Sequence, residues 1–389
     1  MIFLNYWAWH KQLKFMSEIR ARFPDKVLLG IIALLIISGL FIFISASFGL
    51  LTREGASWKS VLFSQFVFGL CGGLALGLLA YIVPIIKIRK YSFYILIIAI
   101  ILCTLVFVPG LGLNTGGAAR WILIAGISFQ PSELLKIALI IFISAWAAGE
   151  GNSIKTFKYG LLPFTGIMAL VGLLMLAEPD TGTYLIMFAS SLSIFISAGG
   201  RIRHIAYLIG VAVLLVGILA LVRPYVRERI STYLNPGDDP LGSSYQVRQS
   251  LLAIGSGKVT GRGFGQSVQK FQYLPEPTGD SIFAVLGEEF GFMGTIFILL
   301  LFISLALRGF KIASRTPNKM SRLLVVGIVT MITSQAFFHI GAMLGMLPLT
   351  GVPLPLVSHG GTAYVFTLAS LGLLLQISSF KPNTILNKT

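Results

Sequence analysis

Four carboxylates stand close together in residues 273–289, where a polar stretch enters a long apolar run: Glu276, Asp280, Glu288 and Glu289. Acidic neighbours and partial removal from water raise the pKa of a carboxyl group, and such a carboxylate makes a useful general base. Asp280 is therefore the leading candidate for a base, although an acid at this place could also cap a helix. Glu288 and Glu289 fall inside the apolar run, where acidic side chains are costly and commonly functional.

Three basic residues, Arg120, Arg248 and Lys258, could bind an anion such as a phosphate. Arg120 stands beside Trp121 and serves either as a phosphate ligand or as an anchor at a membrane interface. Arg248 and Lys258 lie in a long polar stretch, residues 223–280, that contains seven cations and five acids. This stretch is either a solvated loop or a segment that holds an anionic ligand.

The sequence Pro131-Ser132-Glu133 precedes an apolar run, and Lys136 lies about one turn into it. Ser132 is expected to cap the helix, and Glu133 suits the positive end of a helix. Glu133 and Lys136 are three residues apart and can form a pair on one helix face. A cation at this depth usually faces a partner or a cavity, so Lys136 is also a candidate ligand for an anion.

Two more segments favour turns or cavity walls. Glu178 and Asp180 flank a proline between two apolar runs, and we expect helix caps there, with a cation or sugar site as the alternative. Residues 346–362 contain three prolines and three glycines, with Ser358 followed by His359. Broken backbone at membrane depth is tolerated only where protein or water covers it, so this segment is expected to line a cavity.

Other short patterns exclude some chemistries. The glycine-rich stretches 255–258 and 261–265 lack the spacing of phosphate-binding and dinucleotide-binding loops, which argues against a nucleotide cofactor. Cys71 and Cys103 both lie in apolar runs and form neither a disulfide framework nor a metal-binding pattern.

The elements that must position these residues are membrane helices. Of 389 residues 56% are hydrophobic and only 11% are charged, and the mean hydropathy is +0.87. This composition excludes a soluble enzyme and a disordered protein. About 20 apolar residues span a bilayer. We expect an all-α polytopic protein with ten spans: residues 27–49, 60–82, 91–109, 132–149, 159–177, 181–199, 204–222, 281–307, 323–346 and 356–379.

The distribution of charge predicts the orientation. The net charge is +16, and most of the basic residues fall in alternate connections, which the positive-inside rule assigns to the cytoplasm. The excess of cations is thus explained without a nucleic-acid partner. We expect a basic cytoplasmic segment at 1–26, a transmembrane domain at 27–380 and a cytoplasmic tail at 381–389. The stretch 223–280 then becomes an extracytoplasmic loop between helices 7 and 8.

Taken together in their order, these motifs resemble the SEDS family (shape, elongation, division and sporulation) of FtsW and RodA proteins, from about residue 27 onward. The strings that carry the resemblance are Gly-Ala-Ala-Arg120-Trp121, Gln130-Pro131-Ser132-Glu133 with Lys136, Pro179-Asp180-Thr181-Gly182-Thr183, Tyr273-Leu-Pro-Glu276 with Asp280, and Pro353-Leu-Pro355 with Ser358. The run 269–276 is more similar to FtsW than to RodA. The family commonly has His-Thr-Asp-Phe where this chain has Thr278-Gly279-Asp280-Ser281, and Tyr where it has His359.

The resemblance implies an inverting peptidoglycan glycosyltransferase in the bacterial plasma membrane, at the division septum, with Asp280 as the catalytic aspartate. Its substrate would be lipid II and the growing lipid-linked glycan. Its partners would be a class B penicillin-binding protein and other divisome or elongasome membrane proteins. We expect no cofactor, and leave a divalent cation open. The expected substrate-binding residues are Arg120, Lys136, Arg248 and Lys258 for the pyrophosphate, with Glu276, Glu133 and Ser358 beside them.

The residues support this chemistry, because a sugar hydroxyl needs a base whereas a lipid pyrophosphate leaves readily as an anion. Nearby cations would stabilise that departing anion. Two other functions stay open at this point. Intramembrane charge and broken helices also suit a lipid II flippase, and a scaffold that only activates a penicillin-binding protein would share the same fold. The gathering of suitable groups at one face rather than at the midplane favours the enzyme.

Overall fold

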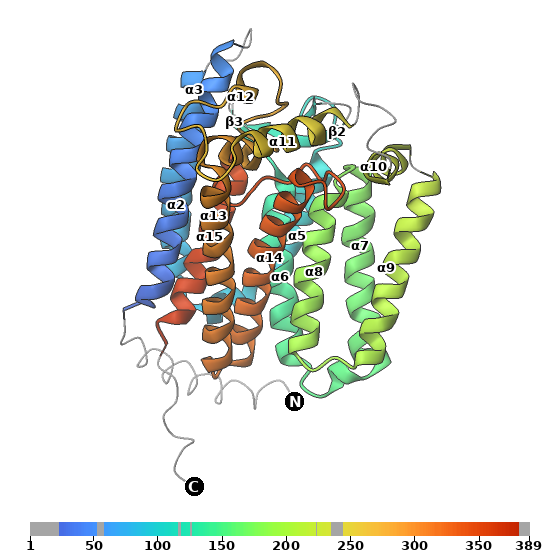
Figure 1. Ribbon diagram of the computed structural model, residues 1–389. Coiled ribbons are helices and arrows are strands. Elements are labelled where there is room, and N and C mark those ends of the chain that lie inside the picture. Colours follow the sequence, from blue (N-terminus) through green and yellow to red (C-terminus); the bar gives the residue numbers. More distant parts are fainter. Residues whose placement is uncertain are drawn as a thin grey trace.

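The computed structural model describes residues 23–52, 58–115, 118–124, 127–222, 224–234 and 244–380. Most of the expected basic segment 1–26 and the expected tail 381–389 lie outside the described residues. The described chain is a bundle of long helices with shorter elements gathered at one end (Figure 1). We call this end the sheet end, because it carries the strands β1, β2 and β3.

All ten predicted spans are helical. The long helices are α2 (Lys26–Ser47), α3 and α4 (Trp58–Ser64 and Gly72–Ile82, joined by a π-helical stretch, Gln65–Cys71), α5 (Ile85–Leu105), α6 (Pro131–Gly149), α7 (Leu162–Ala177), α8 (Thr181–Ser197), α9 (Ile202–Val222), α13 (Ile282–Arg315), α14 (Lys319–Met343) and α15 (Gly361–Ser378). Among the described residues nine helical stretches are long and apolar enough to cross a membrane, and Thr181–Ser197 is a shorter apolar helix. The prediction of a polytopic helical membrane protein is confirmed.

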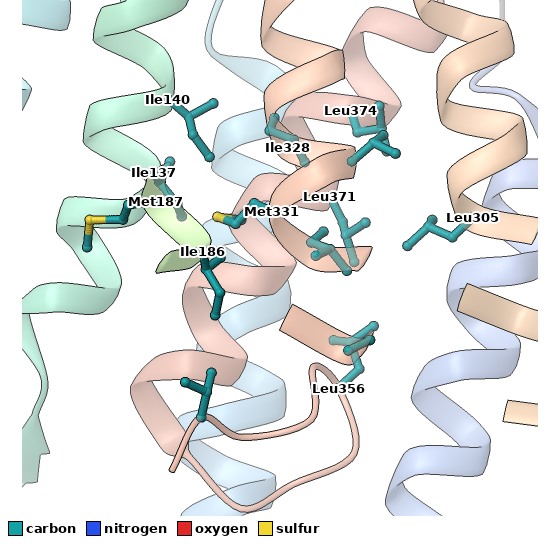
Figure 2. Packing of buried hydrophobic residues seen from close by; sticks show 14 of the residues in the cluster. Ile137, Ile140, Ile186, Met187, Leu305, Ile328, Met331, Leu356, Leu371 and Leu374 are labelled. Carbon is teal, nitrogen blue, oxygen red and sulfur yellow. The ribbon is translucent and has the colours of Figure 1, made fainter. Parts of the chain in front are cut away.

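Helix α14 lies at the centre of the bundle and is buried along most of its length. Apolar side chains of α6, α8 and α15 pack against it, among them Ile140, Ile186 and Leu371 (Figure 2). Helix α9 is the opposite case, since few of its side chains are buried in the isolated chain and many are exposed. A helix that is apolar all round and yet exposed is suited to contact with lipid.

Small residues allow two of the helices to touch. A Cβ atom added at Gly372 of α15 would collide with the backbone of Gly77 of α4, and one added at Gly77 would lie 2.9 Å from the carbonyl oxygen of Leu368. Membrane helices lack a hydrophobic drive toward each other and rely on such close packing. The glycines therefore fix the position of α15, which follows directly on the irregular segment of the site.

The first and last described spans meet at the end of the bundle opposite to the sheet end. Asp25 caps α2 by accepting a hydrogen bond from the Leu28 amide (2.9 Å), and its carboxylate binds Arg308 of α13 (2.6 and 2.9 Å). The Asp25 amide donates to Ser378 at the end of α15 (3.1 Å). The Arg308 guanidinium holds the pKa of Asp25 below its usual value. An even number of crossings would place both ends on the same side of the membrane, which is consistent with these contacts.

The sheet end contains structure that the sequence analysis did not predict. Strands β1 (Gly112–Thr115), β2 (Ala118–Ile124) and β3 (Ile127–Phe129) form an antiparallel sheet in the order β1-β2-β3. The stretch expected as a long loop contains three helices: α10 (Pro224–Leu234), α11 (Tyr245–Ser256) and the short α12 (Gln269–Gln272). Figure 1 places these elements together above the helical bundle.

Helix α13 is broken near its start. Gly291 has φ 63° and ψ −161°, which lies outside the helical region and suits a residue without a Cβ atom. The chain leaving α11 fills the break, because the amides of Phe292 and Met293 donate to the carbonyl oxygens of Lys258 and Val259 (2.9 and 3.1 Å). The break therefore fixes the chain of the sheet end to the helical bundle.

Candidate active site

A cavity of about 350 Å³ opens at the sheet end. Its walls are α10, α11, the last turns of α14 and the irregular segment 344–352, and Asp280 contributes to its lining. The prediction that the proline-rich segment lines a cavity is confirmed. A volume of this size is typical of sites for small molecules.

Asp280 lies on a tight turn just before α13. The amides of Gly279 and Ser281 both donate to the carbonyl oxygen of Glu276 (3.1 Å each), and Glu276 has a φ of 43°, which is rare for a residue other than glycine. Gln246 of α11 donates to the Ser281 hydroxyl (3.0 Å). The turn thus fixes the backbone on both sides of the candidate base.

A second clamp comes from the segment before α15. The Ser358 hydroxyl donates to the carbonyl oxygen of Gly279 (2.9 Å), and the His359 amide donates to that of Thr278 (2.6 Å). Ser358 is buried and also accepts a hydrogen bond from the Leu354 amide (2.8 Å). Ser358 therefore positions the turn that carries Asp280, and its hydroxyl is already engaged within the protein. The ring of His359 stacks on Phe43 (centroids 5.8 Å apart).

The surroundings of Asp280 raise its pKa to about 6. Burial is the largest cause, and the neighbouring carboxylate of Glu276 adds to it. The guanidinium groups of Arg229 and Arg120 act in the opposite direction. Asp280 therefore has the raised pKa that the sequence predicted, and Glu276 is the acidic neighbour that contributes to it. The carboxylate stays largely ionised at neutral pH and can accept a proton there.

Arg229 of α10 lines the same cavity as Asp280, and its positive charge lowers the pKa of that carboxyl group. The sequence alone did not distinguish Arg229 from the other cations of the stretch 223–280. A Cβ atom added at Gly351 would lie 3.5 Å from Oδ2 of Asp280 and 3.7 Å from Nη2 of Arg229. Gly351 has a φ of 65°, and its missing side chain leaves a space that both groups border. A carboxylate and a guanidinium thus face one small volume inside the cavity.

Arg120 of β2 reaches the turn between α7 and α8. Its guanidinium donates to the carbonyl oxygens of Glu178 (3.1 Å) and Pro179. Asp180 accepts a hydrogen bond from the Thr183 amide (3.2 Å) and caps α8, which confirms the predicted cap. Glu178 is fully buried, and burial followed by the Asp180 charge raises its pKa to about 8.

Lys136 and Glu133 form the predicted pair (2.9 Å), and both side chains are buried. Lys136 also donates to Gln335 of α14 (2.9 Å), whose amide donates to the carbonyl oxygen of Pro353 (2.9 Å). This network ties α6 and α14 to the irregular segment. The predicted Ser132 cap is wrong: α6 begins at Pro131, Gln130 occupies the cap position, and the buried Ser132 hydroxyl has no hydrogen-bond partner among the described residues.

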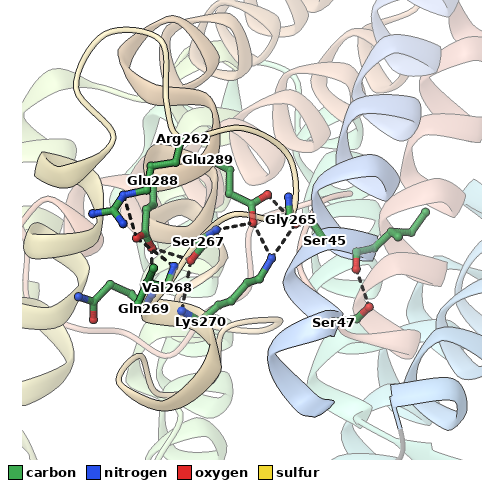
Figure 3. A network of polar contacts seen from close by, with 11 residues as sticks. Ser45, Ser47, Arg262, Gly265, Ser267, Val268, Gln269, Lys270, Glu288 and Glu289 are labelled. Atoms are coloured by element: carbon green, nitrogen blue, oxygen red, sulfur yellow. Dashed lines mark hydrogen bonds and ion pairs between the residues drawn. The ribbon is translucent and has the colours of Figure 1, made fainter. Parts of the chain in front are cut away.

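Glu288 and Glu289 do not face Asp280. Glu289 binds Lys270 (2.6 Å) and Ser45 (2.5 Å), while Glu288 accepts from Ser267 (2.6 Å) and the amides of residues 268 and 269 (Figure 3). Their interpretation as neighbours that perturb Asp280 is wrong. Both carboxylates instead fix the loop between α11 and α12.

Arg248 and Lys258 are exposed, and neither lines the cavity. Glu276 is exposed beside the turn that carries Asp280. His339 of α14 does line the cavity, with Nδ1 2.9 Å from the carbonyl oxygen of Val352, and its Nε2 has no hydrogen-bond partner within the described part of the chain. The described residues contain no group of three His, Cys, Asp or Glu side chains that could hold a metal ion.

Fold and site together define a polytopic membrane protein with a charged cavity at one end of its bundle. Residues 25–383 match the family model for FtsW, RodA and SpoVE, described as "Cell cycle protein". The chain belongs to this family.

Relatives and solved structures agree with this assignment. The chain is 40% identical over 296 residues to stage V sporulation protein E of Bacillus subtilis, covering 75% of this chain and 80% of that protein. It is 38% identical over 291 residues to the "Probable peptidoglycan glycosyltransferase FtsW" of Geobacter metallireducens, covering 75% and 78%.

Among solved structures, one described as "Structural coordination of polymerization and crosslinking by a peptidoglycan synthase complex" matches with a TM-score of 0.73 and 26% identity, over 91% of this chain and 97% of the other. RodA of Thermus thermophilus matches with a TM-score of 0.66 and 26% identity, over 91% and 96%.

Proposed function

We propose that this protein is a peptidoglycan glycosyltransferase that polymerises lipid II at the sheet end of the bundle, with Asp280 as the general base. The class of activity is that named for its FtsW relatives. The observation that carries the assignment of the base is the position of Asp280. It is a carboxylate with a pKa of about 6 in a cavity that it shares with Arg229. The sheet end would face the outside of the cell.

The reaction needs one proton acceptor. A hydroxyl oxygen of the acceptor sugar attacks the anomeric carbon of the donor, and a new glycosidic C–O bond forms with inversion. The bond between that carbon and the lipid pyrophosphate breaks, and the pyrophosphate leaves with the bonding electron pair. Asp280 takes the hydroxyl proton. The pyrophosphate leaves as a stable anion, so no paired general acid is required.

Negative charge develops on the departing pyrophosphate, and preorganised cations stabilise it. We assign this role first to Arg229, which lines the cavity with Asp280. Arg120 comes second, because its charge also lowers the pKa of Asp280 although it does not line the cavity and donates to the carbonyl oxygens of Glu178 and Pro179. Arg248 and Lys258, which are exposed and do not line the cavity, become weaker candidates. Lys136, with Glu133, would act indirectly by holding the irregular segment, and Ser358 by holding the turn of Asp280.

The partner and the cellular site are part of the same proposal. A class B penicillin-binding protein would supply crosslinking, and the similarity to a synthase complex that coordinates polymerization and crosslinking supports this pairing. Work at the division septum is supported by the similarity to FtsW proteins.

The test uses purified wild type, Asp280→Asn and the control Glu150→Gln, each reconstituted with a class B penicillin-binding protein and supplied with lipid II. We expect Asp280→Asn to lose at least about 100-fold in polymerisation rate, the usual contribution of a general base. Glu150 lies at the other end of the bundle, at the end of α6, so its variant should polymerise as wild type does. Undiminished polymer from Asp280→Asn would refute the role of Asp280.

The same reconstitution separates the two other functions. Absence of polymer from every variant, together with movement of labelled lipid II across sealed vesicles, would support a flippase. Polymer that depends only on the partner and is unchanged when this chain carries Asp280→Asn would support a scaffold.

A further inference from the structure

A second cavity, of about 320 Å³, lies in the loop that leads to the turn of Asp280. It is lined by Gly265, Gln266, Ser267, Val268, Phe271, Gln272 and Tyr273. We call it the loop cleft. Nothing in the reaction described above uses it, although the chain passes from it to the candidate base within a few residues.

The loop cleft is held by buried charge. Glu288 and Glu289 accept hydrogen bonds from the amides of residues 267, 268 and 269, and the Gly265 amide donates to Ser45 (3.2 Å) (Figure 3). Lys270 is fully buried and binds Glu289 and Ser45 (2.6 and 3.0 Å). Burying an ion pair seldom adds net stability, but it can fix one conformation. The network therefore holds the loop in a defined shape.

The same network determines which polar groups of the loop remain accessible to a ligand. The backbone amides from residue 267 to residue 270 all donate inward, to Glu288, Glu289 or Ser267. The side chains of Gln266, Gln272 and Tyr273 remain exposed. The cleft thus presents two carboxamides, a phenol and an aromatic face.

These groups select the chemistry of the ligand. None of the seven lining residues is charged. An uncharged cleft offers little to a pyrophosphate, whereas carboxamides both donate to and accept from hydroxyl and acetamido groups. An aromatic ring can cover the apolar face of a sugar. The lining therefore fits a neutral saccharide.

The cleft also lies within reach of the reaction. Asp280 lies seven positions after Tyr273 in the sequence, so even a fully extended chain would place them no more than about 25 Å apart. The turn at Glu276 shortens this path. A glycan of a few sugar units could therefore occupy both places at once.

From these observations we propose that the loop cleft is a saccharide subsite that holds N-acetylated hexosamine units of the lipid-linked glycan beside the catalytic cavity. The proposal rests on the proposed function, because it assigns the cleft to a sugar of the same reaction. Two sources share this chemistry: the strand already made and the sugars of an incoming lipid II.

The test compares wild type with the double variant Gln266→Leu/Gln272→Leu, whose side chains keep similar size but lose their hydrogen bonds. The control is Asn152→Leu, an exposed amide at the opposite end of the bundle. A soluble hexamer of N-acetylglucosamine serves as the binding probe. We expect about tenfold weaker binding in the double variant, as for two lost neutral hydrogen bonds, and no change in the control.

Two kinetic measurements then distinguish the sources. The rate of the first glycosidic bond between two lipid II molecules and the mean length of the product are measured on the same preparations. An unchanged first bond with shortened strands assigns the cleft to the growing strand. A first bond slowed in proportion to the loss of binding assigns it to the sugars of lipid II. Unchanged binding, rate and length in the double variant would overturn the proposal.

Asp280→Asn separates this proposal from the proposed function. The cleft is built without Asp280, so this variant should bind the hexamer as wild type does while polymerising at least about 100-fold more slowly. Full polymerisation by Asp280→Asn would refute the role of the base and leave the binding result valid. Loss of hexamer binding in Asp280→Asn would instead show that the probe occupies the catalytic cavity, and would overturn the loop cleft as its site.

Discussion

The pH dependence of polymerisation reports directly on Asp280. A carboxyl group with a pKa of about 6 is about nine-tenths ionised at pH 7 and about one-tenth ionised at pH 5. A group at the ordinary value of 3.8 would still be about nine-tenths ionised at pH 5. Because only the ionised form accepts a proton, the activity should fall about tenfold between pH 7 and pH 5.

The variant Glu276→Gln tests the cause of the shift. Burial remains in this variant and the acidic neighbour is lost, so the pKa of Asp280 should decrease and the acidic limb of the profile should move to lower pH. Arg229→Gln removes a cation that favours the charged carboxylate, and the limb should move to higher pH. The two variants therefore shift the same limb in opposite directions.

The assay measures kcat/KM for lipid II between pH 4.5 and pH 8.5, with Glu150→Gln as a control that should leave the limb in place. The position of the limb is independent of any loss in maximal rate, so a weakened Arg229→Gln variant stays informative. A profile that is flat down to pH 4.5, or one on which both variants move the limb in the same direction, would refute the electrostatic account of Asp280.

Three further predictions concern the framework of the site. Lys136→Met leaves Glu133 buried without its cation and should lower the free energy of unfolding by about 3–5 kcal/mol, measured by thermal unfolding. Much of this loss should be recovered in the double variant Lys136→Met/Glu133→Leu. A raised KM with unchanged stability would instead make Lys136 a direct ligand of the substrate. The pKa of Glu178 is raised from 4.5 to about 8, so the folded state keeps a proton that the unfolded chain releases, and stability decreases as the pH rises through this window. Glu178→Gln should therefore gain roughly 1–3 kcal/mol at pH 7 and nothing at pH 4, and equal effects at both pH values would contradict this linkage. The pair of Asp25 and Arg308 is partly exposed, so Arg308→Gln should cost at most about 1 kcal/mol, and less at high salt.

The membrane helices could be predicted from sequence because their signal is a property of each segment alone. A run of about 20 apolar residues has few alternatives to a membrane helix, and this held even for the shorter helix Thr181–Ser197. The sheet and the three helices of the stretch 223–280 depend on contacts with the rest of the sheet end. Their segments are short and mix polar with apolar residues, so no clear period distinguishes them.

The site was predictable to the extent that single residues stand out. Asp280 was marked by its place at the entry of an apolar run, and Arg120 by its place beside Trp121. Arg229 was one of seven cations in a polar stretch, and only its position beside Gly351 distinguishes it. Glu289 looked like a functional acid in lipid because its partner, Lys270, lies on the short helix α12, whose position no local sequence pattern encodes.

The break at Gly291 sets the position of the candidate base, Asp280, along the membrane normal. The part of α13 from 292 to 315 would be about 36 Å long at the helical rise of about 1.5 Å per residue, which already exceeds the roughly 30 Å hydrocarbon core of a bilayer. The short helical piece above the break, and Asp280 before it, would then stand at the level of the phosphate groups. A substrate with a lipid tail could present its pyrophosphate there without leaving the membrane. Lengthening or shortening α13 by one turn below Gly291 would shift the base by about 5 Å along the membrane normal, relative to a substrate whose depth the bilayer fixes.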